Sequence, residues 1–383
     1  MDFLTIPIVK EIFKFFGFDD DARKQLKNWR ASLGRPQYFH QMPDLRYGQL
    51  TISDWVVMEG VFPEGIAINA VVDDNVPLQL PPGFEAHKAA FLRVNGERQE
   101  KQLEPNFYNG PLISMYSFYP VRSEDKHERP IFRIKATHSG FMDYACTIAS
   151  LDGPLYEGSG TVRENFFPNW DGEVSAKLPG MGCPGLTLAV ITRDERMIMV
   201  KRGPNVSVAA GAWHCSVDEG VRPEDAVDGK VDYVRVAYRG LKRELGIEAK
   251  AVSEPPKITS MGYSRGMVQY GAIGHVFLDV LLKDVMADIS KAKEGRENEA
   301  WKAIPFTPKA LSKELKRMIK DAEPAIPSFG LATLIMALHG SRRYTLSQVH
   351  DHFNDKAFLH GDLVFPRPDR PADIWAFRDQ VAH

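Results

Sequence analysis

Two short segments of the sequence, residues 213–224 and 239–244, hold charged side chains whose types and spacing could do chemistry. The carboxylates of Glu219, Glu224 and Glu244 are oxygen ligands of the kind that Mg²⁺ and Mn²⁺ take in proteins. The second segment adds three basic residues that suit contacts with phosphate: Arg239, Lys242 and Arg243. These residue types favour a site for a phosphorylated small molecule, with Mg or Mn as its cofactor where the carboxylates converge.

A single helix is predicted to carry the second segment. Five apolar residues between 231 and 247 recur every three or four positions and form its buried face: Val231, Val234, Tyr238, Leu241 and Leu245. Gly246 is expected to end the helix, because glycine enters the left-handed C-cap conformation at little steric cost. Gly240 lies inside the helix, where glycine costs about 1 kcal/mol relative to alanine. This cost indicates that another backbone, or a ligand, packs closely at Gly240.

The segment from about residue 184 to 325 resembles a Nudix domain. Five positions match the end of that family's helix motif: Arg239, Leu241, Glu244, Gly246 and Ile247. The resemblance implies α/β/α layers around a mixed sheet, with helix glutamates that hold a divalent metal against a substrate pyrophosphate. It also implies catalytic roles for Glu244 and Glu219, and a metal-binding set of Glu244, Glu219 and Glu224.

Two substitutions depart from the family's motif. Gly240 and Arg243 occupy the places of two of the three helix glutamates, so Glu244 alone remains. Glu224 lies fifteen residues before Arg239 instead of eight, which requires an insertion of seven residues near 225–232. Because Mg²⁺ binds weakly to a single carboxylate, any Mg or Mn cofactor is expected to be weakly held.

The same substitutions add positive charge to the helix. Arg239 and Arg243 are one turn apart with Lys242 beside them, and Trp213 and Arg202 complete the predicted ligand contacts. We expect the domain to bind a nucleotide or another pyrophosphate-containing small molecule, as a catalytically weakened sensor or scaffold. Two alternatives stay open. One is an active metal-dependent hydrolase of a nucleoside diphosphate derivative with non-standard ligands, and the other is a purely structural assembly protein.

Part of the sequence is also similar to the isopentenyl diphosphate isomerases, which share the Nudix fold. Five residues match their loop and helix: Trp213, Ser216, Val217, Glu244 and Gly246. The similarity places their catalytic cysteine at Asp218 and their metal-binding histidine at Gly220. Because their proton transfer requires both groups, isomerase activity is not expected here.

The predicted secondary structure around these motifs changes along the chain. Residues 1–35 are predicted to be helical, and residues 36–175 hold short Val, Ile, Phe and Thr-rich runs that are typical of an antiparallel β domain. These runs are 50–62, 65–72, 89–94, 131–138 and 142–148. Strands and helices alternate through the Nudix-like region, 176–343, and residues 344–383 add a helix and a Pro-rich tail. The predicted fold is α+β and multidomain.

The bulk composition bears on partners and compartment. A net charge of −2 over 383 residues gives no reason to expect a nucleic-acid partner. Three scattered cysteines predict reduced thiols and a cytoplasmic protein. The apolar segment 1–18 carries charges and is too short to span a bilayer, so no transmembrane span is expected. We expect this segment to form an amphipathic helix that, with the β domain, contacts a second copy of the chain or another protein.

Overall fold

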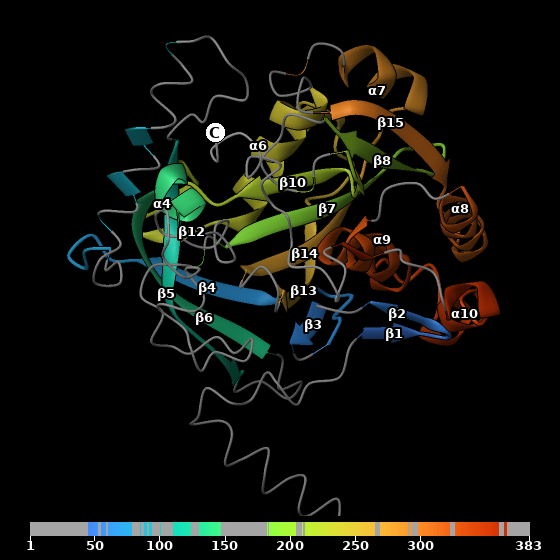
Figure 1. The fold of residues 1–383 in the computed structure, drawn as a ribbon, viewed down its shortest axis with the longest axis horizontal. Coiled ribbons are helices and arrows are strands. Elements are labelled where there is room, and N and C mark those ends of the chain that lie inside the picture. The colour runs from blue at the N-terminus through green and yellow to red at the C-terminus, as the bar shows by residue number, and fades with distance from the viewer. Residues whose placement is uncertain are drawn as a thin grey trace, which may run out of the picture.

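The computed structural model describes most of the chain between residues 45 and 365 (Figure 1). The described ranges are 45–52, 55–58, 60–78, 110–123, 130–146, 184–203, 211–264, 269–289, 298–321, 326–359 and 364–365, with isolated positions between 85 and 100 and at 182, 209 and 292. The predicted helix at 1–35 and the Pro-rich tail lie outside them. Within these ranges, no helix has the length and apolar character needed to cross a membrane.

Eight of the described strands form one mixed sheet. Six follow the order β15-β8-β7-β14-β13-β3, while the short strands β9 and β10 pair with β8 and β7. Their bounds are β3 Trp55–Met58, β7 Gly185–Ile191, β8 Arg196–Arg202, β9 Trp213–His214, β10 Val217–Gly220, β13 Lys257–Ser264, β14 Gln269–Phe277 and β15 Asn298–Pro305. β14 runs parallel to β7, and the other pairs are antiparallel. This is the mixed sheet that the sequence predicts.

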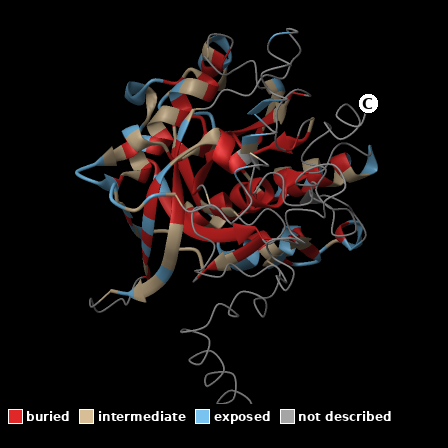
Figure 2. Cartoon of the chain, turned by 60° about the vertical axis from the view of Figure 1, so that its left-hand side comes forward, coloured by how far each residue is buried: buried red, intermediate tan, exposed pale blue. Residues whose placement is uncertain are grey.

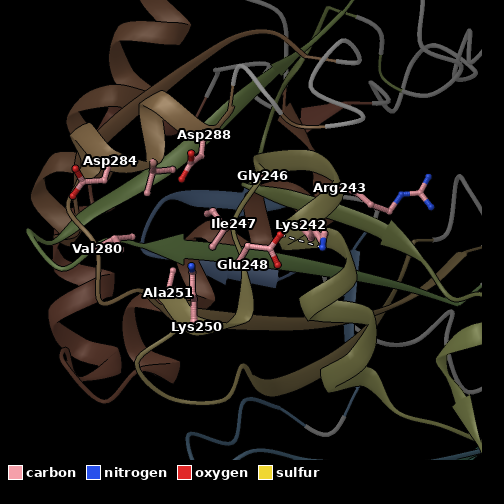
Figure 3. A pocket seen from close by; sticks show the side chains of 11 residues that line it. Lys242, Arg243, Gly246, Ile247, Glu248, Lys250, Ala251, Val280, Asp284 and Asp288 are labelled. Atoms are coloured by element: carbon pink, nitrogen blue, oxygen red, sulfur yellow. Dashed lines mark ion pairs between the residues drawn. The ribbon is translucent and has the colours of Figure 1, made fainter.

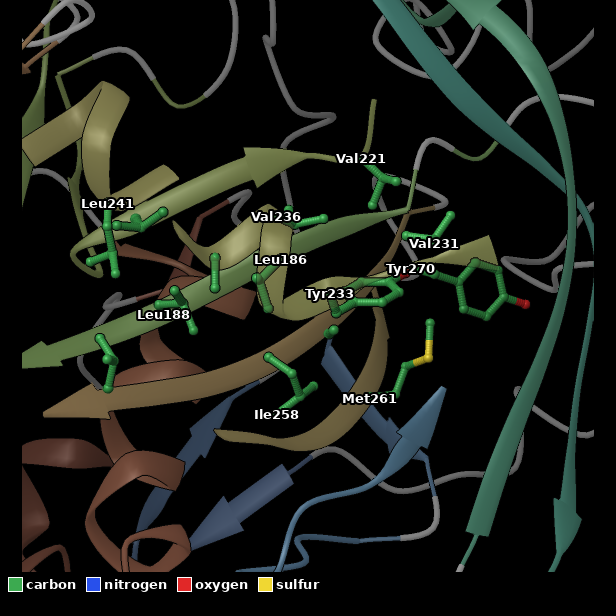
Figure 4. Packing of buried hydrophobic residues seen from close by; sticks show 14 of the residues in the cluster. Leu186, Leu188, Val221, Val231, Tyr233, Val236, Leu241, Ile258, Met261 and Tyr270 are labelled. Atoms are coloured by element: carbon green, nitrogen blue, oxygen red, sulfur yellow. The ribbon is translucent and has the colours of Figure 1, made fainter. Parts of the chain in front are cut away.

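Helices cover both faces of this sheet. Alternate residues of β7 point to opposite sides: Leu186 and Leu188 pack in a core cluster with α6, whereas Ala189 and Ile191 pack with α9. Figure 4 shows the first of these clusters, between β7 and the side chains of α6. The helices are α6 Tyr233–Leu245, α7 Leu282–Ile289, α8 Pro308–Lys320, α9 Ser328–Gly340 and α10 Leu346–His352. The result is an α/β/α layered unit.

A second sheet contains five of the described strands, in the order β11-β12-β4-β6-β5. Their bounds are β4 Ala67–Val72, β5 Pro111–Arg122, β6 Pro130–Gly140, β11 Ala226–Val227 and β12 Lys230–Val231. β4 pairs with β6 in parallel, so the prediction of a purely antiparallel domain is wrong. The inner face of the sheet packs on the larger sheet, where the Phe118 ring stacks on Tyr270 with centroids 4.7 Å apart.

Both sheets cross the predicted boundary between residues 175 and 176. β3, from the predicted β domain, pairs with β13 in the larger sheet. The hairpin β11–β12, from the predicted Nudix-like region, joins the second sheet where Lys230 pairs with Val71. The two predicted domains therefore exchange strands, although the boundary itself stays a prediction.

Long periodic elements lie close to their predicted bounds, as do the short runs 65–72 and 131–138, which match β4 and β6, whereas two other short apolar runs are helical. The sequence predicts a helix over 231–245, a strand over 298–305 and helices over 309–319 and 329–339, and α6, β15, α8 and α9 begin and end within two residues of these bounds. The run 142–148 was predicted as a strand but contains the helix α4, Phe141–Cys146. The described positions in 89–94 are also helical. An apolar run of six or seven residues is too short to distinguish the two periods.

Short elements complete the described fold. β1 Leu45–Tyr47 pairs with β2 Leu50–Ile52, and β16 Ile326–Pro327 pairs with β17 Val364–Phe365. Single 3₁₀ turns lie at η4 Pro223–Asp225, η5 Ala249–Ala251 and η7 Lys356–Phe358. Of these, η4 matters most for the site, because it connects β10 to the hairpin that precedes α6.

Candidate functional site

Strand β10 and helix α6 position the charged residues that the sequence singles out. Ser216 anchors the start of the strand, because its hydroxyl donates to Ile198 O at 2.6 Å and accepts from Val190 N at 2.9 Å. The helix begins after Asp232, whose carboxylate accepts from Val234 N at 2.9 Å. It ends at Gly246, which has the predicted left-handed conformation with φ of 70°. These anchors hold β10 along the helix.

Gly240 is the point of closest approach between the two elements. A Cβ atom at this position would lie 2.5 Å from Val217 Cγ1 and 3.3 Å from Glu219 Cβ. A close packing contact at this glycine is therefore confirmed, but the contacting atoms are side chains of β10 and not another backbone. The same contact leaves no room for a larger side chain at this position, since β10 fills the space.

Replacing Gly240 with alanine is expected to destabilise the protein by about 1–3 kcal/mol, because overpacking at Val217 exceeds the gain in helix propensity. Chemical denaturation would measure this loss. Alanine at the exposed position Arg235 on the same helix serves as the control, with an effect of about 0.5 kcal/mol or less. The variant V217A should partly rescue Gly240→Ala, and strict additivity of the two changes would contradict the steric explanation.

Three carboxylates meet at the contact of β10 with α6. Glu244 Oε1 accepts a hydrogen bond from Asp218 N at 3.1 Å, and Glu219 and Glu244 are both buried. Burial raises the pKa of Glu244 well above its usual range, and the nearby charges of Glu219 and Asp218 raise it further. Burial also raises the pKa of Glu219 and of Asp218. The structure thus brings together the two residues predicted to be catalytic, and adds Asp218.

Arg239 occupies the centre of a buried ion-pair network. Its Nε donates to Asp225 Oδ1 at 2.9 Å, and its Nη2 donates to Asp225 Oδ2 and to Gly220 O, each at 2.6 Å. Its Nη1 lies 2.5 Å from Glu219 Oε1. Burial lowers the pKa of Arg239, but these acidic contacts outweigh it and leave the pKa raised. Arg239 was predicted to contact a ligand, but each nitrogen of its guanidinium already contacts a group of the protein.

Arg202 and His214 border the carboxylates on the side of β8 and β9. Arg202 Nη1 lies 3.8 Å from Asp218 Oδ2, and His214 Nε2 lies 3.7 Å from the same oxygen. Burial lowers the pKa of His214 to about 3, with a further decrease from the charge of Arg202. Its ring is therefore neutral at physiological pH. Arg202, a predicted ligand contact, does lie beside the carboxylates.

The other predicted ligand contacts point in different directions. Lys242 pairs with Glu248 at 3.1 Å and lines a surface pocket of about 600 Å³ at the end of α6. Figure 3 shows the Arg243 side chain extending away from that pair. The ring of Trp213 is covered by Lys302 Nζ, 3.6 Å from its centroid. Arg239, Lys242 and Arg243 consequently do not form the single cationic edge that their spacing predicts.

The residue that completes the network, Asp225, was missed by the sequence interpretation. Glu224 was chosen instead, but its side chain is 51 % exposed and lies 4.0 Å from Arg222. Asp225 is 2 % exposed and also accepts from Arg222 N at 2.8 Å. The available signal was the Pro223 that begins η4, because proline at the start of a short turn favours an acidic residue facing back to its N-terminus.

The predicted metal-binding set is only partly assembled. Among the described residues, no three His, Cys, Asp or Glu side chains are arranged to hold a metal ion. Glu224 lies in solvent, and one oxygen of Glu219 contacts Arg239. The other oxygen, Oε2, is buried without a hydrogen-bond partner among the described residues. A Mg or Mn cofactor held by Glu244, Glu219 and Glu224 stays a prediction.

Comparisons with known proteins give matches among solved structures alone. No protein-family model matches the chain, and no curated protein matches it. Its structure is similar to the crystal structure of DR0079 from Deinococcus radiodurans, with 13 % sequence identity and a TM-score of 0.29. The match covers 43 % of this chain and 88 % of that protein. A score at this level assigns neither a fold family nor a function to the chain.

Proposed function

We propose that this chain binds a nucleotide or another small molecule with a pyrophosphate group, and that binding does not depend on a metal. The observation that supports metal independence is the set of arginines around the β10–α6 carboxylates. Arg239 contacts Glu219 and Asp225, and Arg202 lies beside Asp218. These guanidinium groups supply positive charge where a metal-dependent site would use a dication, so hydrolysis is weakened or lost.

The basic residues at the end of α6 are accessible to an anionic ligand. Lys242 is 65 % exposed, and an exposed ion pair such as Lys242–Glu248 contributes little stability, so a phosphate can replace the glutamate. Lys250 lines the same pocket, together with the acidic residues Asp284 and Asp288 and the apolar residues Ile247 and Val280. A volume of about 600 Å³ lies in the range of small-molecule sites.

Thermal unfolding with a panel of ADP, ADP-ribose, a sugar nucleotide and inorganic pyrophosphate tests this proposal. A ligand that binds only the folded state raises Tm, by an amount equivalent to about 2.7 kcal/mol at one hundred times its Kd. We expect a saturable shift that persists in EDTA. The double variant K242A/K250A should weaken it, whereas K313A on α8 should not. If no ligand of the panel shifts Tm, with or without Mg²⁺, the proposal is contradicted.

A second candidate is an active metal-dependent hydrolase. The unpartnered Glu219 Oε2 and the raised pKa of Glu244 favour it, because buried carboxylates short of partners are suited to bind a cation. This candidate requires Mg- or Mn-dependent turnover of a nucleoside diphosphate derivative. Glu244→Gln should abolish the turnover, and K313A on α8 should leave it intact. Absence of product at high enzyme and metal concentrations would exclude this function in favour of the first.

Glu244→Gln is also expected to stabilise the protein, by about 1–3 kcal/mol at neutral pH. The pKa of Glu244 is raised on folding, so the folded state prefers the protonated form. The free energy of unfolding therefore decreases as pH rises from the unfolded pKa to the folded pKa, and stays low above it. Glutamine retains an oxygen that can accept from Asp218 N but carries no charge.

Denaturation between pH 4 and pH 9 measures this effect. The wild-type protein should lose stability with rising pH more steeply than Glu244→Gln does. Glu224→Gln, at an exposed side chain, provides the matched control and should follow the wild-type profile. Equal pH profiles for wild type and Glu244→Gln would show that Glu244 does not carry an unfavourable buried charge.

A further inference from the structure

The outer face of the five-stranded sheet presents an ordered set of basic side chains. The strand register aligns Lys135 of β6 with Val71 of β4 and Ser117 of β5, and Val71 in turn with Lys230 of β12. Residues paired across strands point to the same face. Lys230, Val71 and Lys135 are all exposed, while the neighbouring Ala70 and Ile134 are buried in the core. Figure 2 shows this alternation of buried and exposed residues along the strands.

A second row lies two residues along the same strands. Here Arg133 of β6 stands between Asn69 of β4 and Tyr119 of β5. Arg133 and Asn69 are exposed, and the tyrosine side chain is 39 % exposed. Arg133 and Lys135 are therefore about 7 Å apart along one strand, with an aromatic ring one strand spacing, about 5 Å, from the arginine.

The basic residues on this face lack acidic partners among the described residues. Arg133, Lys135 and Lys230 make none of the ion pairs found there, whereas acidic groups gather at one end of the strands. At that end Asp74 pairs with His138 at 2.7 Å, and Asp73 lies near Tyr116. Unpaired cations on an open sheet face create a local positive potential although the whole chain carries a net charge of −2.

We propose that this face, defined by Asn69, Val71, Tyr119, Arg133, Lys135 and Lys230, binds single-stranded nucleic acid. A sheet face that combines unpaired cations with an exposed aromatic ring can contact phosphates and stack a base at the same time. Tyr119 on β5 is paired directly with Arg133 on β6. The tyrosine ring and the guanidinium are therefore close enough to contact the base and the phosphate of one nucleotide. An acidic polypeptide would use the cations but gain little from the tyrosine ring.

This inference is independent of the phosphate ligand proposed for α6. It differs from the expectation drawn from composition, since net charge averages over faces and does not reveal a local group of three cations. The face contains no residue of the β10–α6 site. A variant that removes its cations should therefore leave ligand binding at α6 unchanged.

Fluorescence anisotropy with labelled twenty-residue oligothymidylate and oligouridylate tests the inference on the full chain. We expect binding at low salt that weakens as salt rises, with a slope of log K against log[salt] near −2, since each of three phosphate contacts contributes about −0.7. The triple variant R133A/K135A/K230A should bind at least tenfold more weakly and have a slope near zero. Y119A should lose about tenfold in affinity while it keeps the wild-type salt slope.

Controls separate this surface from general charge effects. K313A removes an exposed lysine from α8 and should bind like wild type. All of the substituted side chains are solvent-exposed, so circular dichroism should show unchanged folding. Failure of the wild-type protein to bind at low salt, or unchanged binding by the triple variant, would overturn the proposal. Competition by polyglutamate as effective as that by unlabelled oligothymidylate would overturn it in favour of an acidic protein partner.

Discussion

Replacing Asp225 with alanine is expected to lower the free energy of unfolding by about 3–5 kcal/mol, because it leaves a buried arginine without its main partner. Asp225 accepts two hydrogen bonds from Arg239 and one from Arg222 N. Glu219 alone would then face the Arg239 guanidinium. Urea denaturation followed by circular dichroism measures the loss, with the denaturant slope checked for constancy.

Glu224 provides the matched control for Asp225, because it is the preceding residue of the same turn but is exposed. Glu224→Ala should change stability by about 0.5 kcal/mol or less. A double-mutant cycle with R239M then isolates the coupling between Asp225 and Arg239. A loss below about 1 kcal/mol for Asp225→Ala would show that the network is not structural, and would return Arg239 to consideration as a ligand contact.

Trp55→Ala should lower the free energy of unfolding by about 3–5 kcal/mol. It should also lower the Tm of the whole described structure. Trp55 is 2 % exposed and its ring lies over Gly262, where a Cβ atom would come within 2.2 Å of Trp55 Cζ2. Its ring also lies 6.2 Å from that of Phe329 on α9. The side chain thus belongs to the β domain of the sequence prediction, but it fills the core of the α/β/α unit.

Calorimetry decides whether this shared core makes the two regions cooperative. We expect one transition for the wild-type protein and one, at lower Tm, for Trp55→Ala, with calorimetric and van't Hoff enthalpies in agreement. Tyr119→Ala removes an exposed aromatic ring from the second sheet and should leave Tm nearly unchanged. Two separate transitions, with Trp55→Ala lowering the Tm of one and leaving the Tm of the other unchanged, would instead support the independent domains that the sequence suggests.

Periodicity in the sequence predicted the elements that bury one continuous face. The helix over 231–247 and the strand over 298–305 are examples, and both lie where they were expected. The mixed character of the larger sheet also followed from alternating strands and helices. The pairing between strands far apart in sequence could not be predicted, because the residues of β3 and of the β11–β12 hairpin do not indicate which strand each pairs with.

The candidate site shows the same division. Gly240 signalled a close packing contact, and the structure confirms that β10 lies against it. Glu244 and Glu219, both named as candidates from the sequence, lie close enough in the structure for the charge of Glu219 to raise the pKa of Glu244. Arg239 was expected to contact a ligand, but its guanidinium donates to Asp225 instead. The position of an arginine in a sequence motif does not reveal whether another residue of the protein already accepts its hydrogen bonds. That choice depends on how the loop before α6 folds back.

The strand exchange across residue 175 has a consequence for any attempt to divide the chain. A fragment that begins at 176 would expose the long edge of β13, where β3 normally pairs, and would leave the β11–β12 hairpin without β4. Uncovered edges of this length recruit strands from other molecules, so such fragments should aggregate on expression. The same constraint would act on gene rearrangement, because neither half could be transplanted into a new protein without carrying the complementary strands of the other.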